Sequence, residues 1–205
     1  MKRNKEETKQ RLIETVGKII EKDGFKKIGI NSVAKKAGVD KVLIYRYFDG
    51  LNGLLNEYIM QEDLVKKLIE EFNTVDIDDK DSFIKSALDF YLKQLNDLRH
   101  NKKYQEILLW ELDEKNDVTT KIAEAREQKS NELFEKMGSL KIYENIDVPA
   151  INNILIGGII YQVLRSRHVD QFAGLNYSDE SGWKRLEKSI LFLVNMIADM
   201  IFDEN

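Results

Sequence analysis

The chain has 205 residues, of which 42% are hydrophobic and 33% charged, so it carries enough apolar side chains for a folded core. It contains one proline and no cysteine, which excludes a disulfide framework, a thiolate metal site and a cysteine nucleophile. No stretch approaches the ~20 apolar residues of a membrane span or resembles a signal peptide, so we expect a cytoplasmic protein that contacts no membrane.

Charge is distributed unevenly along the sequence. Residues 1–50 contain 13 Lys or Arg and 7 Asp or Glu, whereas the rest of the chain contains 19 and 29. The first quarter is therefore basic (+6) and the remainder acidic (−10), although the whole chain carries only −4. This asymmetry predicts that the first quarter binds a polyanion. A chance clustering of solvated lysines is the alternative.

Three short helices are predicted within residues 1–50. Residues 6–23 place apolar side chains at helical spacing, and Gly24 follows where a helix ends. A second helix over residues 30–37 ends at Gly38 in the same way. Asp40 then stands where a carboxylate caps the next helix. Two short helices joined by the turn "GVD" form a helix-turn-helix.

The third helix, residues 41–48, has two different sides. Successive side chains are about 100° apart, so Ile44 and Phe48 face the first two helices while Val42, Leu43 and Arg46 point away. Exposed aliphatic groups beside an arginine suit the DNA major groove, where they can contact thymine methyls and guanine. The remaining side chains lie on the flanks, where phosphates would run. The predicted DNA-contacting residues of this helix are Lys41, Val42, Leu43, Tyr45, Arg46 and Tyr47.

From residue 51 onward the periodicity predicts longer helices that form a larger helical domain for ligand binding and dimerisation. The predicted helices cover about 51–73, 82–98, 103–113, 118–137, a segment beginning near Pro149, and 182–203. The first of these would connect the DNA-binding helices to the larger domain. The prediction is an all-α chain of about nine helices, with a DNA-binding domain at 1–50 and a second domain at 51–205.

The last two predicted helices are apolar on nearly every side, as "NILIGGIIYQVL" (153–164) and "ILFLVNMIADMIF" (190–202) show. Such helices must be buried on more than one side, which favours pairing with a second copy of the chain. A central position in a large monomer is the alternative. Glycine within a helix costs about 1 kcal/mol relative to alanine, which close helix approach would offset. The predicted dimer contacts are Gly157, Gly158, Ile190, Val194 and Ile197.

A small-molecule pocket is predicted in the second domain. Its candidate lining is Tyr91, Trp110 and Tyr161, with Arg126 as the polar partner. Aromatic residues at helical spacing also occur as plain core, and this alternative stays open. No metal or cofactor is expected.

The stretch "GINSVAKKAGVDKVLIYRYFDGLNGLL", residues 29–55, resembles the N-terminal part of the tetracycline-repressor (TetR) family of bacterial transcription regulators. The resemblance implies a homodimer that binds a palindromic double-stranded DNA operator, acts as a repressor and is released by a small-molecule effector. By position, the six residues of the third helix match DNA-contacting places of the family, and Asn31 matches a residue that meets phosphate.

The sequence departs from the family pattern at four positions. Gly29 stands where the family usually has Thr or Ser, Leu51 where it has a basic residue, and Asn52 and Gly53 where it has acids. The change at Leu51 removes an expected phosphate contact, and Gly50 with Gly53 is expected to loosen the start of the fourth helix. We therefore expect modest operator affinity.

Two other functions are less consistent with the sequence. An enzyme is disfavoured because His100 and His168 have no neighbouring nucleophile or metal-ligand spacing. A helical adaptor that binds no DNA would leave the exposed Val42 and Leu43 and the basic first quarter unexplained. Salt-dependent binding to duplex DNA distinguishes the adaptor from the regulator.

Overall fold

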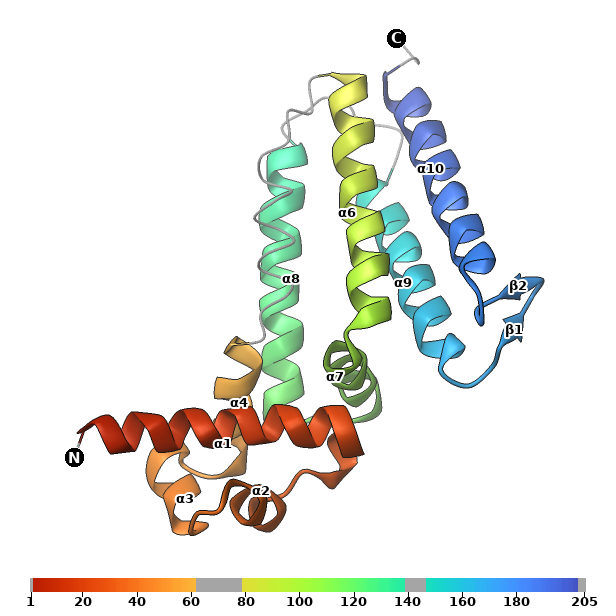
Figure 1. Ribbon diagram of the computed structural model, residues 1–205. Helices are drawn as coiled ribbons and strands as arrows, with labels where there is room; N and C mark the ends of the chain where they lie inside the picture. Colours follow the sequence, from red (N-terminus) through yellow and green to blue (C-terminus); the bar gives the residue numbers. More distant parts are fainter. Residues whose placement is uncertain (1, 62–78, 139–146, 203–205) are drawn as a thin grey trace. The chain divides into compact units, whose positions relative to one another are not determined.

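The computed structural model of the chain describes residues 2–61, 79–138 and 147–202 (Figure 1). These residues form nine α-helices and one short β-hairpin, so the predicted all-α class is confirmed. The chain divides into two compact units. The first unit comprises Met1–Leu64 and Asn101–Glu127, and the second comprises Val65–His100 and Gln128–Asn205.

The first unit is built around α1. This helix packs against η1, α2, α4 and α7, and α3 packs against α4. The apolar side chains between these helices form one core, in which Leu12, Val16, Ile20, Val33 and Leu54 are completely buried. The elements of this unit are α1 (Lys2–Asp23), the 3₁₀ turn η1 (Phe25–Lys27), α2 (Ile30–Ala37), α3 (Val42–Phe48), α4 (Leu51–Gln61), α7 (Lys102–Asp113) and the first half of α8 (Asp117–Gly138).

The helix-turn-helix has the local structure that the sequence predicts. α2 ends at Gly38, whose φ of 67° and ψ of 38° lie in the left-handed region. Asp40 caps the following helix, because its Oδ1 accepts a hydrogen bond of 2.8 Å from the Val42 N–H. Short-range chemistry therefore fixes both the end of α2 and the start of α3.

Gly53 lies in the first turn of α4, directly after the chain leaves α3. A Cβ atom at this position would lie 1.6 Å from the Phe48 carbonyl oxygen and 2.8 Å from its carbonyl carbon. The clashing atoms belong to the backbone, which cannot rotate aside as a side chain would. Glycine at position 53 therefore lets α4 begin this close to α3, and the expectation that it loosens the start of α4 stays a prediction.

The second unit contains α6 (Lys80–His100), the end of α8, α9 (Val148–Ser166), the hairpin strands β1 (Gln171–Phe172) and β2 (Leu175–Asn176), and α10 (Glu180–Phe202). α6 packs against both α9 and α10. The antiparallel strands pair Gln171 with Asn176 and Phe172 with Leu175. This hairpin differs from the purely helical pattern predicted for the second domain.

The units are not divided at residue 50, where the sequence analysis placed its boundary. α4 belongs to the first unit because Leu54, Leu55 and Tyr58 pack into the same core as α1. α7 also belongs there, although it follows α6 of the second unit without a long linker. Residues 62–73 of the predicted fourth helix lie outside the described part of the chain.

α9 is the one described helix that is long and apolar enough to cross a membrane by length and composition. Two of its polar side chains attach it to neighbouring elements of the second unit. Asn152 accepts a hydrogen bond of 3.0 Å from the Tyr91 hydroxyl of α6, and Gln162 accepts one from the Tyr177 hydroxyl after the hairpin. We therefore treat α9 as a packed helix with one uncovered apolar side.

Replacement of Gly53 tests the close approach of α4 to α3. Gly53→Ala should lower the free energy of unfolding by about 1–3 kcal/mol because the new methyl group forces the two helices apart. Urea denaturation followed by circular dichroism measures this change. Gly29→Ala is the control, since its backbone is extended (φ −168°) and its Cβ would meet only Ser32 Oγ at 3.8 Å. Equal losses in both variants would contradict the prediction.

Candidate nucleic-acid interface

Two buried side chains fix the orientation of α3. Ile44 is completely buried and Phe48 nearly so, and both pack into the core of the first unit. They stand four residues apart and so lie on the same side of the helix. The prediction that these two residues face the core is confirmed.

The opposite side of α3 is open to solvent. Val42 is 51% exposed and Tyr45 55% exposed, and Arg46, which follows Tyr45 in the chain, is also exposed. Leu43 and Tyr47 are half-buried on the margins of this side. A surface that combines aliphatic groups, aromatic groups and an arginine matches the chemistry of base edges in the major groove.

Cations on this side differ from those elsewhere in the first unit. Lys26 forms an ion pair with Asp113 at 3.2 Å, and Lys36 forms one with Asp23 at 3.4 Å. Within the described residues, Lys41 and Arg46 form no ion pair, and both are exposed. Asn31 is likewise exposed, in the first turn of α2. Unneutralised positive charge therefore lies where the sequence predicts contact with DNA. Contact itself remains a prediction.

Two cations beside α3 were not singled out from the sequence. The Lys5 Nζ lies 5.5 Å from the centre of the Tyr47 ring, and the Lys9 Nζ lies 5.5 Å from the centre of the Phe48 ring. The sequence did contain a signal for them: Lys5 and Lys9 are four residues apart and lie on the same side of the first helix as Leu12 and Val16.

The turn after α1 is attached to α7. The rings of Phe25 and Trp110 stack with centres 3.9 Å apart and planes 13° from parallel. The Phe25 N–H donates to Glu106 Oε2 at 3.4 Å, and the Trp110 indole N–H donates to Glu114 Oε2 at 2.9 Å. Trp110, a predicted pocket residue, thus packs in the core of the first unit.

Arg126, the predicted polar partner of the pocket, also lies in the first unit. It donates a hydrogen bond to Glu111 Oε2, and its guanidinium lies 5.9 Å from the centre of the Tyr104 ring. Burial raises the pKa of the Glu111 carboxyl, and the charge of Arg126 acts in the opposite direction. Burial also raises the pKa of the Tyr104 hydroxyl.

The other two predicted pocket residues lie in the second unit and have different surroundings. Tyr91 is buried, and its hydroxyl donates to Asn152; burial raises the pKa of this hydroxyl. Tyr161 is half-exposed and packs edge-on against Phe172 of β1, with ring centres 5.7 Å apart. The four residues thus divide between the two units, and their pocket role stays a prediction.

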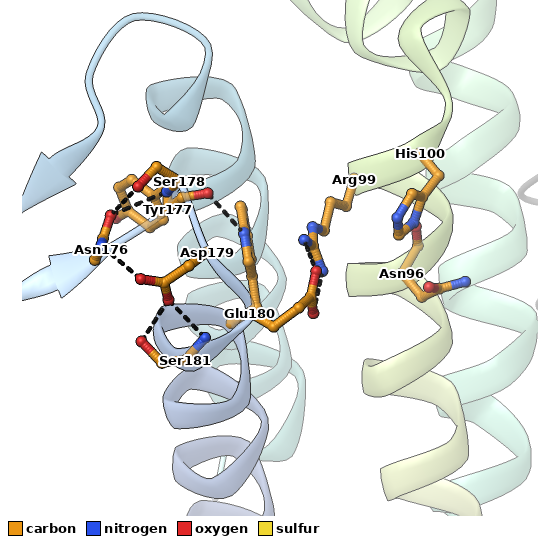
Figure 2. Close-up of polar contacts among 10 residues, drawn as sticks. Asn96, Arg99, His100, Asn176, Tyr177, Ser178, Asp179, Glu180 and Ser181 are labelled. Atoms are coloured by element: carbon orange, nitrogen blue, oxygen red, sulfur yellow. Dashed lines mark hydrogen bonds and ion pairs between the residues drawn. The ribbon is translucent and has the colours of Figure 1, made fainter.

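A polar cluster joins the end of α6 to the start of α10 (Figure 2). Both terminal guanidinium nitrogens of Arg99, Nη1 and Nη2, donate to the Glu180 carboxylate, the first at 3.1 Å, and the guanidinium lies 4.5 Å from the centre of the Trp183 ring. The hydrogen bond from Arg99 lowers the pKa of Glu180. His100 points elsewhere, with its Nδ1 2.8 Å from the Asn96 carbonyl oxygen.

Asp179 completes the start of α10. It accepts a hydrogen bond of 2.7 Å from the Ser181 N–H and another from the Ser181 hydroxyl, which together lower the pKa of Asp179. Its other oxygen accepts from the Asn176 amide of β2 at 2.7 Å. Asp179 therefore acts as a helix cap and ties the hairpin to α10.

The predicted dimer residues fall into two groups. Gly157 and Gly158 are exposed on α9, and a Cβ at either would meet no atom within 4 Å. Ile190 and Val194 are instead buried within their own unit and Ile197 is half-buried, so these residues lie toward the inward side of α10 and their role in a dimer stays a prediction. The exposed large apolar side chains of these two helices are Ile154, Tyr161, Leu191, Phe192, Leu193, Met196 and Met200.

Residues 13–58 match the family described as bacterial regulatory proteins of the tetR family. This segment of the chain is a TetR-type N-terminal domain. The matched residues include all of α2 and α3 and most of α4, so the exposed side of α3 lies within the matched helix-turn-helix. No curated protein sequence matches the chain significantly.

Solved structures of TetR regulators share the fold over nearly the whole chain. A TetR family transcription regulator from Marinobacter aquaeolei VT8 is 13% identical, with 98% of each chain covered and a TM-score of 0.59. NalD, the secondary repressor of the MexAB-OprM multidrug efflux pump in Pseudomonas aeruginosa, is 19% identical, with 90% of this chain and 96% of NalD covered (TM-score 0.61).

A third similar structure holds a ligand. FadR from Bacillus subtilis in complex with stearoyl-CoA is 15% identical, with 96% of this chain and 99% of FadR covered and a TM-score of 0.58. At these identities the likeness establishes a common fold. The family and these neighbours are transcription regulators rather than enzymes.

Arg46 and Lys41 should contribute differently to DNA binding. Arg46→Ala should cost about 1–3 kcal/mol and relax the preference at one base position, because Arg46 lies on the outward side of α3. Lys41→Ala should weaken binding to all sequences equally and reduce the salt slope by about one. Titration of a preferred duplex and a random duplex at several salt concentrations measures both effects. Equal losses on the two duplexes for Arg46→Ala would contradict its assignment.

Proposed function

We propose that the protein is a dimeric repressor that binds a palindromic operator and releases it when a small, largely apolar ligand binds. The observation that carries the proposal is the exposed side of α3, where Val42 and Arg46 point outward while Ile44 and Phe48 anchor the helix in the core. A helical adaptor would gain nothing from apolar and cationic groups presented together to solvent.

Dimer formation is supported by the uncovered apolar sides of α9 and α10. Ile154 is 73% exposed and Phe192 64% exposed, and Gly157 and Gly158 leave room for another helix to approach closely. So many large apolar groups on two helices of one unit indicate a surface that a partner covers. The two reading helices of the dimer would then lie ~34 Å apart, one turn of DNA, so that each contacts one half-site.

An apolar ligand is supported by the composition of the second unit and by the likeness to FadR with stearoyl-CoA bound. Buried groups such as Phe83, Ala198 and Ile201 form an apolar core there, and Tyr91 with Asn152 adds one polar pair. These features suit a molecule with a large apolar part and few polar groups.

Two helices are suited to carry a signal into the DNA-binding unit. α4 contacts α1 through Tyr58, whose ring lies 3.1 Å from the position of a Cβ on Gly17. α7 contacts the turn after α1 through the stack of Trp110 on Phe25. A shift of either helix would move α1 and the reading helix that depends on it, and both reading helices must fit one operator together.

The first experiment tests assembly and operator binding. Light scattering at micromolar concentration should give twice the chain mass of 23.9 kDa. Phe192→Asp together with Met196→Asp should give a monomer, because two charges would be buried in the interface. Ala123→Asp, an exposed position on α8, should leave the dimer intact. Selection of duplexes from a random pool should return a palindrome. A monomeric wild-type protein would contradict the proposal.

The second experiment tests ligand release. A ligand that raises the melting temperature should lower operator affinity roughly 5- to 150-fold, which corresponds to a coupling of about 1–3 kcal/mol. The operator should weaken ligand binding by the same factor, because coupling between two binding sites is reciprocal. Calorimetric titration of each partner with and without the other measures both factors. Unchanged affinities in both directions would show that ligand binding does not control the operator complex.

A further inference from the structure

Lys5 and Lys9 occupy an unusual position on α1. They continue the side of this helix that carries Leu12 and Val16, both of which are completely buried. A helix whose first turns served only for packing would carry apolar residues at these two positions. Lys5 is instead exposed and Lys9 half-buried, so the charged end of the core-facing side reaches solvent beside α3.

Aromatic rings of α3 hold both lysines. The ammonium group of Lys5 lies over the Tyr47 ring and that of Lys9 over the Phe48 ring, each 5.5 Å from the ring centre. The negative face of an aromatic ring attracts a cation, and the aliphatic part of a lysine side chain packs on apolar surface. Tyr47 is on the margin of the reading side, next to Arg46 in the chain. Lys5 is therefore fixed at the edge of the surface proposed to enter the groove, and Lys9 lies one helical turn farther along the same side of α1.

The two ammonium groups lack an acidic partner within the described residues, whereas Lys26 and Lys36 in the same unit each have one. Like charges four residues apart on a helix repel each other. Holding them together is unfavourable for the free protein and becomes favourable when an anion lies close to both.

We propose that Lys5 and Lys9 bind backbone phosphates of the DNA duplex beside the recognition helix, with Tyr47 and Phe48 as the platforms that hold their ammonium groups in place. The proposal rests on the proposed function as a DNA-binding regulator. It makes α1 a third DNA-contacting element, one that adds affinity without reading bases. Tyr47 then serves in part as a positioning residue for Lys5.

The salt dependence of DNA binding tests the phosphate contacts. Each phosphate contact contributes about 0.9 to the slope of log affinity against log salt. Lys5→Gln and Lys9→Gln should each lower the slope by about 0.9 per protomer, with the same fold-loss on the selected duplex and on a random duplex. Lys18→Gln is the matched control, because it removes the same charge from the same helix at an exposed position on the opposite side. The salt slope of Lys18→Gln should equal that of the wild type, or differ from it by less than half the change seen for Lys5→Gln and Lys9→Gln.

The platform role of Tyr47 is tested by combining variants. Lys5→Gln should weaken binding less in a Tyr47→Leu background than in the wild type, because the ammonium group is no longer held in place. An equal loss in both backgrounds would overturn the platform. Unchanged slopes for Lys5→Gln and Lys9→Gln, with Arg46→Ala still altering base preference, would overturn the phosphate contacts and leave the proposed function standing. A wild-type protein that binds no duplex would overturn both.

Discussion

The DNA-binding unit depends on how one very short helix is held. α3 has only seven residues, fewer than an isolated helix needs to be stable in water, so its conformation must come from packing. Ile44 and Phe48 provide that packing. Because side chains follow at fixed angles around a helix, burying these two residues also sets the direction of every other side chain of α3. The chemistry offered to DNA is therefore decided inside the protein core.

Burial and charge act together in this unit. The outward aliphatic groups of α3 are unfavourable in water, and the unpaired cations around them repel one another. Both features slightly lower the stability of the free protein and would become favourable when the helix lies in a groove of duplex DNA. The ion pairs of Lys26 and Lys36 stand at other positions, where charge is neutralised within the protein. The first unit thus contains cations that pair with carboxylates at its surface and, around α3, cations without an acidic partner among the described residues.

The features that could be predicted from the sequence depend on residues close together in the chain. Most of those that could not be predicted depend on packing between distant residues. The helix over residues 30–37 and the Asp40 cap of the next helix were predictable, because a glycine or a carboxylate within a few positions of each helix end determines them. The hairpin gave little signal because its turn uses Ala173 and Gly174 at positive φ, where Asn-Gly is the usual pair. In α10, apolar residues on all sides hid which side faces inward. The stack of Phe25 on Trp110 joins residues far apart in sequence, so periodicity could not assign α7 to the first unit.

That stack bears on how the reading module can be transplanted. In the sequence, residues 1–50 look like a self-contained cassette, and a hybrid regulator would naturally be cut there. The core continues into α7 and the start of α8 through Trp110, Val118 and Ile122. A cassette cut at residue 50 would leave Phe25 facing a foreign helix and the indole without its stacking partner. The segments that must be transferred together are therefore those that pack together. A functional hybrid would include Asn101–Glu127 as well as the N-terminal helices.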